Sequence, residues 1–111
     1  MGLAHCETSG IEFAFSWAEL PDSTAAEPAL AQMRAALLHH LGGRAAAPTA
    51  FAVMGMTENA EALTQAVTGE RQARLALFTR GSRVYQLLAQ SDKPIAAAVW
   101  TEFAGSIKLI N

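Results

Sequence analysis

The sequence predicts an α+β domain with an antiparallel sheet, and three patterns carry this prediction. Residues 74–90 alternate as two strands on either side of a tight turn at Arg80-Gly81-Ser82. Residues 11–17 alternate in the same way, with the period of two that is typical of a half-buried strand. Between these regions, residues 29–41 carry apolar side chains at helical spacing. We therefore expect both strands and helices around one core.

The length and composition favour one soluble, cytoplasmic domain. The chain has 111 residues, the size of a single domain, which we expect at residues 11–111 after a flexible tail at residues 1–10. The only cysteine, Cys6, cannot form an internal disulfide. No segment approaches the about 20 apolar residues needed to cross a membrane, and the first residues lack the pattern of a signal peptide.

The charge balance argues against a nucleic-acid partner. Eight basic and ten acidic residues give a net charge of −2, whereas nucleic-acid binding needs a basic face. Charged residues make up only 16% of the chain. This low share fits a protein that buries surface in an oligomer, and it fits an alanine-rich coding background equally well. We expect the four clustered arginines to be solvated strand and turn residues: Arg71, Arg74, Arg80 and Arg83.

The first predicted strand has one strongly apolar face. This face carries four large side chains at alternate positions, namely Ile11, Phe13, Phe15 and Trp17. Glu12, Ala14 and Ser16 lie on the other face. Turn chemistry at residues 20–23 ends the strand.

The helix that follows has two alternative starts. Thr24 can cap it with Glu27 completing a capping box, or Pro28 can be its first residue. Apolar residues three or four positions apart form one stripe: Leu30, Met33, Leu37 and Leu41. Gly42-Gly43 can adopt the left-handed conformation that ends a helix, so we expect the helix over residues 29–41.

The middle of the chain is less regular. Residues 49–54 predict a strand. Residues 57–67 support two interpretations. With Thr57 as a cap and acidic residues in the first turn they form a helix, which we favour. The alternating side chains of residues 63–67 would instead make a strand.

The last third of the chain has the clearest pattern. In the strands predicted at residues 74–79 and 83–90, both faces carry apolar side chains, so we expect a packing layer on each side of the sheet. A last helix follows Lys93-Pro94, with Asp92 as its cap, and residues 106–110 predict a closing strand.

Two segments of this last third resemble the Mog1/PsbP-like superfamily. The first, LALFTRGSRVYQL at residues 75–87, is similar to a family hairpin with the pattern r-v-Y-q-L. The second, WTEFAGSIKL at residues 100–109, is similar to the family ending F-F-x-S-F-k-L. The order of elements upstream is similar too, so the resemblance spans most of the chain. It implies an α/β/α sandwich with a central antiparallel sheet, and a strand at residues 61–67.

The resemblance also implies how such a protein works. Members include photosystem extrinsic subunits, a small-GTPase regulator and many uncharacterised bacterial proteins. Most bind partners, and no catalytic residues come with the fold. The family usually has a further strand before the position matched by Ile11, where this chain has only ten residues. A free sheet edge would result, and we expect a homodimer to cover it.

The reactive side chains indicate no catalytic or metal site. His39 and His40 are adjacent on a helix and point about 100° apart, so they do not converge on one metal. Glu58 and Glu61 fit exposed acids of a first helical turn better than a catalytic carboxylate pair. Cys6 has no base at recognisable spacing. We therefore expect no enzyme, no metal and no cofactor.

The expected function is binding. We favour a non-enzymatic protein that acts by protein–protein contact as a homodimer. A further, unidentified protein is a possible partner, whereas we expect binding neither to nucleic acid nor to a membrane. The alternative is a small-molecule binding protein with a hydrophobic pocket between sheet and helix. The candidates for a pocket wall or an interface are aromatic residues with large apolar bodies: Phe13, Phe15, Trp17, Tyr85 and Trp100.

Overall fold

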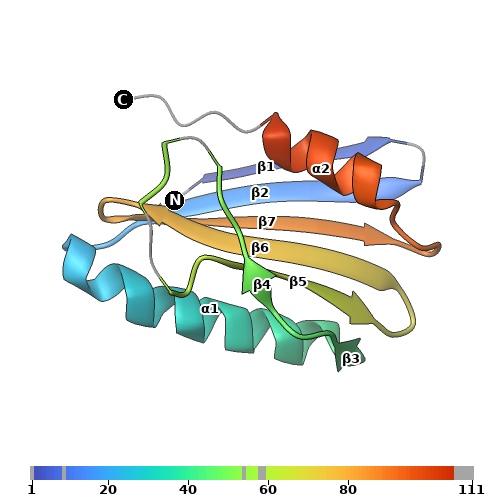
Figure 1. The fold of residues 1–111 in the computed structure, drawn as a ribbon, viewed down its shortest axis with the longest axis horizontal. Coiled ribbons are helices and arrows are strands. Elements are labelled where there is room, and N and C mark those ends of the chain that lie inside the picture. Colours follow the sequence, from blue (N-terminus) through green and yellow to red (C-terminus); the bar gives the residue numbers. More distant parts are fainter. Residues whose placement is uncertain (1, 9, 54, 58–59, 107–111) are drawn as a thin grey trace.

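The computed structural model describes residues 2–8, 10–53, 55–57 and 60–106, and Figure 1 shows their arrangement. In this part of the chain seven strands form one sheet, in the order β1-β2-β7-β6-β5-β3, with β4 also paired to β5. Every pairing is antiparallel, so the predicted α+β class and antiparallel sheet are confirmed. The elements in chain order are β1 (Gly2–Thr8), β2 (Ile11–Glu19), the 3-10 helix η1 (Ser23–Ala25), α1 (Ala26–Leu41), β3 (Arg44–Ala45), β4 (Thr49–Ala50), β5 (Leu63–Thr68), β6 (Gln72–Arg80), β7 (Arg83–Ser91) and α2 (Ala97–Gly105).

One helix packs on each face of the sheet. Leu75 and Leu77 of β6 pack with α1, whereas Ala76 and Phe78 of the same strand pack with α2. Successive residues of a strand point to opposite faces, so the two helices lie on opposite sides of the sheet. The prediction of a packing layer on each face is confirmed. Of the two α-helices in the described ranges, neither is long and apolar enough to span a membrane.

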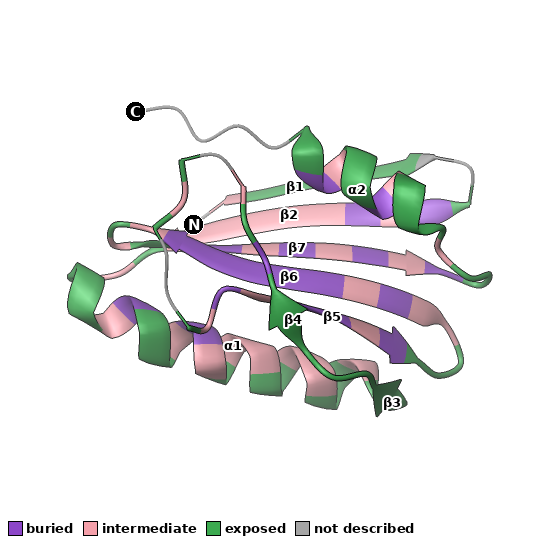
Figure 2. Ribbon diagram, viewed as in Figure 1, coloured by how far each residue is buried: buried purple, intermediate pink, exposed green. Residues whose placement is uncertain are grey.

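The two faces have different cores, and Figure 2 shows buried residues running along β6 and β7 between them. The face under α1 is aliphatic, with Leu30, Val67, Leu75, Leu77 and Val84 buried there. The face under α2 holds the five phenylalanines, the two tryptophans and the tyrosine of the chain, either buried or packed against the buried residues. We call these the aliphatic face and the aromatic face.

The central hairpin follows the prediction closely. β6 and β7 pair along their whole length and close at Arg80 opposite Arg83. Gly81 in the turn has φ of 58°, the left-handed conformation that glycine adopts without steric cost. The alternation predicted for β2 is also confirmed, because Ile11, Phe13 and Trp17 all lie in the aromatic core.

The N-terminal residues correct one prediction. A flexible tail was expected at residues 1–10, but Gly2–Thr8 form β1 and pair with β2 from Gly2 opposite Trp17 onward. A strand therefore precedes Ile11, and backbone hydrogen bonds to β2 hold it in the sheet. The free edge expected at β2 belongs to β1 instead, since no described strand pairs with the outer side of β1.

The middle of the chain corrects two more predictions. The favoured helix at residues 57–67 is wrong, because Leu63–Thr68 form β5 and pair with β6. Thr57 caps no helix; its N–H donates to the Thr79 carbonyl at 2.7 Å. Cross-strand pairing and the burial of Val67 under α1 outweigh the local helical signals.

The strand predicted at residues 49–54 is only Thr49–Ala50 in the structure. The Phe51 N–H still donates to the Ala62 carbonyl at 3.0 Å, after which residues 51–53 leave the sheet edge and cross the aromatic face (Figure 1). Phe51 is buried there against Phe78, and this packing draws the segment away from β5. Met54 lies outside the described residues.

The helix ends differ in detail from the prediction. Asp22, not Thr24, is the capping residue, and its carboxylate accepts the Thr24 N–H at 2.9 Å ahead of η1. Helix α1 follows η1 directly and begins at Ala26, before Pro28, without a side-chain cap of its own. Gly42, with φ of 66°, ends it as expected, and its N–H donates to the Leu38 carbonyl.

Helix α2 begins at Ala97, after Ala96, which makes no side-chain cap. The expected cap, Asp92, pairs with Arg71 instead, at 3.1 Å. Ser106 follows the end of α2 in helical conformation, which contradicts a strand start there. The rest of the closing strand predicted at residues 106–110 lies outside the described residues.

Candidate functional site

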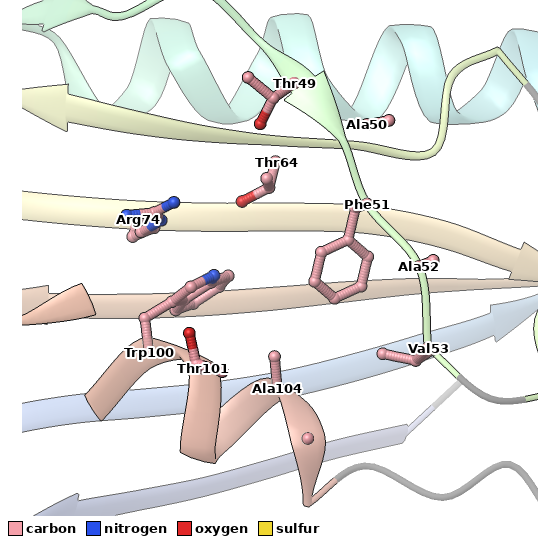
Figure 3. Close-up of a pocket in the computed structure, with 11 residues that line it drawn as sticks. Thr49, Ala50, Phe51, Ala52, Val53, Thr64, Arg74, Trp100, Thr101 and Ala104 are labelled. Atoms are coloured by element: carbon pink, nitrogen blue, oxygen red, sulfur yellow. The ribbon is translucent and has the colours of Figure 1, made fainter. Parts of the chain in front are cut away.

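A pocket of about 630 Å³ lies on the aromatic face between α2 and residues 49–53 (Figure 3). Thr64 of β5 and Arg74 of β6 form its floor. Trp100 and Ala104 of α2 line one wall, and residues 49–53 line the other. The pocket thus gathers residues from four separate parts of the chain.

The lengths of the helices explain why a pocket forms on this face. Helix α1 has 16 residues and is about 24 Å long, whereas α2 has nine residues and is about 13 Å long. The shorter helix cannot cover a sheet face of similar size. Residues 51–53 cover part of the remainder as an irregular segment, and the pocket is the space that neither fills.

Aromatic rings fix the two walls. Phe51 is 9% exposed, and its ring centroid lies 5.6 Å from that of Phe78. Trp100 is 4% exposed, and its ring centroid lies 5.8 Å from that of Phe103. Buried rings held by other rings have few alternative positions, so the apolar part of the pocket is preformed.

The floor contains an arginine on an otherwise apolar stripe. Arg74 occupies the same face of β6 as Ala76 and Phe78, which are both fully buried. Its Cζ lies 5.7 Å from the centroid of the Trp100 ring, a cation–π contact. The Nε atom of Arg74 is buried and has no hydrogen-bond partner among the described residues.

Arg74 also makes no ion pair within the described ranges of the chain. Three other arginines have carboxylate partners: Arg34 with Glu61 at 2.6 Å, Arg71 with Asp92 at 3.1 Å, and Arg83 with Glu19 at 2.6 Å. No described residue that lines the pocket is acidic. The pocket is therefore mostly apolar, with three threonines, Thr49, Thr64 and Thr101, in its lining and one positive charge in its floor.

Thr64 is the second polar group of the floor. Its hydroxyl donates to the Leu75 carbonyl at 2.7 Å, and the residue is 7% exposed. Because the proton of this hydroxyl is engaged, the oxygen faces the pocket side as an acceptor only. Arg74 is thus the group that can donate hydrogen bonds to an anion from the floor.

The structure separates the five aromatic candidates. Trp100 lines the pocket, as described above. Phe13 lies under Phe103, with ring centroids 4.5 Å apart, beside a second hollow of about 290 Å³ that also involves Cys6. The partly buried Phe15 stacks on the buried Tyr85, with ring centroids 5.6 Å apart, and the Trp17 ring lies over Gly2.

Sequence reasoning missed Arg74, Phe51 and Thr64. Arg74 was expected to be solvated, yet it is only partly exposed in the pocket floor. The signal was present, because Arg74, Ala76 and Phe78 alternate and therefore share a face. Phe51 could not be placed, since its position depends on where the chain leaves β5.

The other reactive side chains do not form a site. His39 and His40 are exposed in the last turn of α1, and Cys6 is exposed on β1. Glu61 pairs with Arg34, and Glu58 lies outside the described residues. Within the described residues there is no group of three or more histidine, cysteine or acidic side chains placed to hold a metal.

Comparison of the chain with models of protein families finds no match, and comparison with curated proteins finds no similar sequence.

Proposed function

We propose that this protein binds a small molecule in the pocket between α2 and residues 49–53. The observation that carries the proposal is the pocket itself, about 630 Å³ with Phe51 and Trp100 as preformed walls and Arg74 in its floor. Ligand sites are typically concave, mostly apolar and about 300–1,000 Å³, with a few polar groups that orient the ligand. We also propose that the chain is a Mog1/PsbP-like α/β/α sandwich that acts by binding and not by catalysis.

The two tryptophans provide the test. Trp100 lines the pocket and Trp17 does not, so their indole N–H signals in NMR spectra report on the pocket and on a position outside its lining in the same protein. We expect a screen of small aromatic compounds to yield some that shift the Trp100 signal, leave the Trp17 signal in place and raise the melting temperature.

A matched pair of variants shows whether those compounds occupy the pocket. Ala104 lines it and is 8% exposed, whereas Ala98 is exposed on the same helix. Ala104→Leu fills the space and should abolish binding, and Ala98→Leu should leave it unchanged. If no compound moves the Trp100 signal, the proposal is wrong.

A second candidate function is homodimerisation through β1. The observation that favours it is that β1 has seven residues with an outer edge to which no described strand pairs. On this strand Leu3 is 71% exposed and lies beside Ser16, beyond the strands with which α1 packs. A second copy that adds its own β1 would pair the free backbone groups and cover Leu3.

Analytical ultracentrifugation tests the dimer. We expect the sedimentation coefficient to rise with concentration, and Leu3→Lys to shift the equilibrium to monomer because an edge lysine opposes strand addition. Gln32→Lys, on the exposed side of α1, is the control for added charge. A monomer at every concentration would exclude this second function and leave the pocket unaffected.

A further inference from the structure

We propose that the ligand of this pocket is a monocarboxylate with a compact aromatic or branched apolar body, and that Arg74 binds its carboxylate. This inference rests on the proposed function and names the chemical class of its ligand. It follows from the position of one charge, from the geometry of that charge, and from the absence of a second charge in the described lining.

The position of Arg74 is the first step. A guanidinium that extends over a sheet face among Ala76, Phe78 and Trp100 gives up part of its hydration. Proteins normally compensate such a charge with a carboxylate, as Glu61 does for Arg34 in this chain at 2.6 Å. Arg74 has only the ring of Trp100 and a buried Nε without an acceptor in the described structure. An anion from outside the chain, bound at the partly exposed end of this side chain, would compensate its charge.

The geometry of the guanidinium selects the acceptor. Two neighbouring N–H groups of arginine form a planar fork that matches the two oxygens of a carboxylate. The Nε of Arg74 is buried and has no surface that an outside acceptor could reach, so the fork offered to a ligand is the one formed by the two terminal nitrogens. The cation–π contact with Trp100 limits the positions of the guanidinium plane, so the fork is oriented before the ligand arrives.

The lining indicates the size and charge of the ligand. Figure 3 shows Arg74, Thr64 and Trp100 toward one end of the pocket and Phe51 with Val53 toward the other. A ligand that extends along the pocket would place its anionic group on Arg74 and its apolar body against Phe51. Among the described residues that line the pocket, Arg74 is the sole cation, which favours a single carboxylate over a multiply charged phosphate.

The test compares carboxylates with their neutral amides. Naphthoate and naphthamide share one ring system, as do phenylacetate and phenylacetamide, and each is titrated while the Trp100 indole signal is followed. We expect each carboxylate to bind roughly ten to a hundred times more tightly than its amide, the usual effect of hydrogen bonds to a charged partner.

Three arginine variants locate the effect. Arg74→Gln should remove the preference for carboxylate, whereas Arg83→Gln, which removes an equal charge at the Glu19 pair, should retain it. Arg74→Lys keeps the charge without the fork and should give an intermediate preference. The Trp17 signal shows whether Arg74→Gln folds. If it does not fold, the comparison of carboxylate with amide in the wild type and in Arg74→Lys still tests whether Arg74 binds the carboxylate.

The outcomes separate the two proposals. Equal binding of acid and amide at Trp100 would overturn the carboxylate inference while the pocket function stands. A carboxylate preference that survives Arg74→Gln would also overturn it, since another group would then bind the anion. If no compound of either class shifts the Trp100 signal, the pocket function fails as well.

Discussion

The two faces of the sheet are covered by helices of different length and by side chains of different kinds. Beneath α1 the sheet is covered by a 16-residue helix and the buried side chains are aliphatic, with Leu30, Leu75 and Leu77 fully buried. Beneath α2 the helix has nine residues, and every aromatic side chain of the chain gathers there. A long helix with small branched side chains closes one face, whereas a short helix with large rings closes most of the other.

This difference explains where the pocket is found. Aliphatic side chains on a long helix interdigitate with the strands, and the hollows on this face are smaller, about 230 Å³ beside Met33 and about 180 Å³ beside Leu41. Planar rings reach further than leucines and can cover a face that the helix does not, but they pack only at certain angles and distances. On the aromatic face the remaining space is bounded by Phe51 and Trp100. The face that is harder to fill is the face that carries the candidate site.

The largest expected effect comes from removing the central ring of the aromatic face. Phe78 is fully buried and contacts both Phe51 and Tyr85, at centroid distances of 5.6 and 4.9 Å. Phe78→Ala should lower the free energy of unfolding by about 3–5 kcal/mol, because the surrounding rings cannot collapse into the cavity. Urea denaturation monitored by circular dichroism measures the loss.

Leu30→Ala provides the matched deletion on the aliphatic face. Leu30 is also fully buried, but it lies on α1, which can shift toward the sheet when the side chain is shortened. Its expected cost is about 2–3 kcal/mol, at the lower end for leucine deletions, and it should add to that of Phe78→Ala because the sites lie on opposite faces. If Leu30→Ala costs more than Phe78→Ala, the aliphatic face is the more rigid of the two.

A smaller effect is expected at the edge of the aromatic face, where the Trp17 ring covers the start of β1. A Cβ built on Gly2 would lie 1.9 Å from the Cζ2 atom of Trp17, because the indole crosses over this residue. Gly2→Ala should therefore displace Trp17 or detach the start of β1, at a cost of about 1–3 kcal/mol. Hydrogen exchange should show faster exchange in β1 alone.

Two further variants control this prediction. Gly105→Ala places a methyl group where nothing lies within 4 Å, and it should not destabilise the protein. Trp17→Ala combined with Gly2→Ala should cost less than the sum of the single changes, because the clash is gone. If Gly2→Ala leaves β1 as protected as in the wild type, the indole does not lie over Gly2.

Elements with local sequence signals could be predicted, whereas elements held by distant partners could not. The hairpin of β6 and β7 was predictable, since alternation and a glycine turn are local signals. β1 was not, because residues 2–8 have no clear apolar alternation and are held by pairing with β2. Residues 63–68 likewise form a strand through their partner β6 and not through their own helical signals.

The candidate site was less predictable than the fold. Trp100 was one of five candidates for a pocket wall or an interface, but the pocket also needs Phe51, whose position depends on a chain crossing that no local pattern encodes. Arg74 could have been found from its alternation with Ala76 and Phe78. Its lack of an acidic partner in the described structure could not, because Asp92 and Glu12 pair with Arg71 only in the folded sheet.

The smallest expected effect on stability comes from two carboxylates, one at the margin of each face. Glu19, on the aromatic side, accepts a hydrogen bond from Arg83, which lowers the pKa of Glu19 below its usual 4.5. At the start of the helices on the aliphatic side, hydrogen bonds from the Thr24 hydroxyl and backbone N–H lower the pKa of Asp22.

A carboxyl whose pKa is lower in the folded state stabilises the protein above its unfolded pKa, and this stabilisation is lost as the pH falls through the folded pKa. Glu19→Gln and Asp22→Ala should each lower the melting temperature slightly at neutral pH. The difference from wild type should shrink as the pH falls through the lowered folded pKa of each group, which lies below 4.5 for Glu19 and below 3.8 for Asp22. Both groups are exposed, so salt should shrink the Glu19 effect, whereas the Asp22 effect, which depends on local hydrogen bonds, should persist. Equal salt sensitivity of the two variants would contradict this assignment.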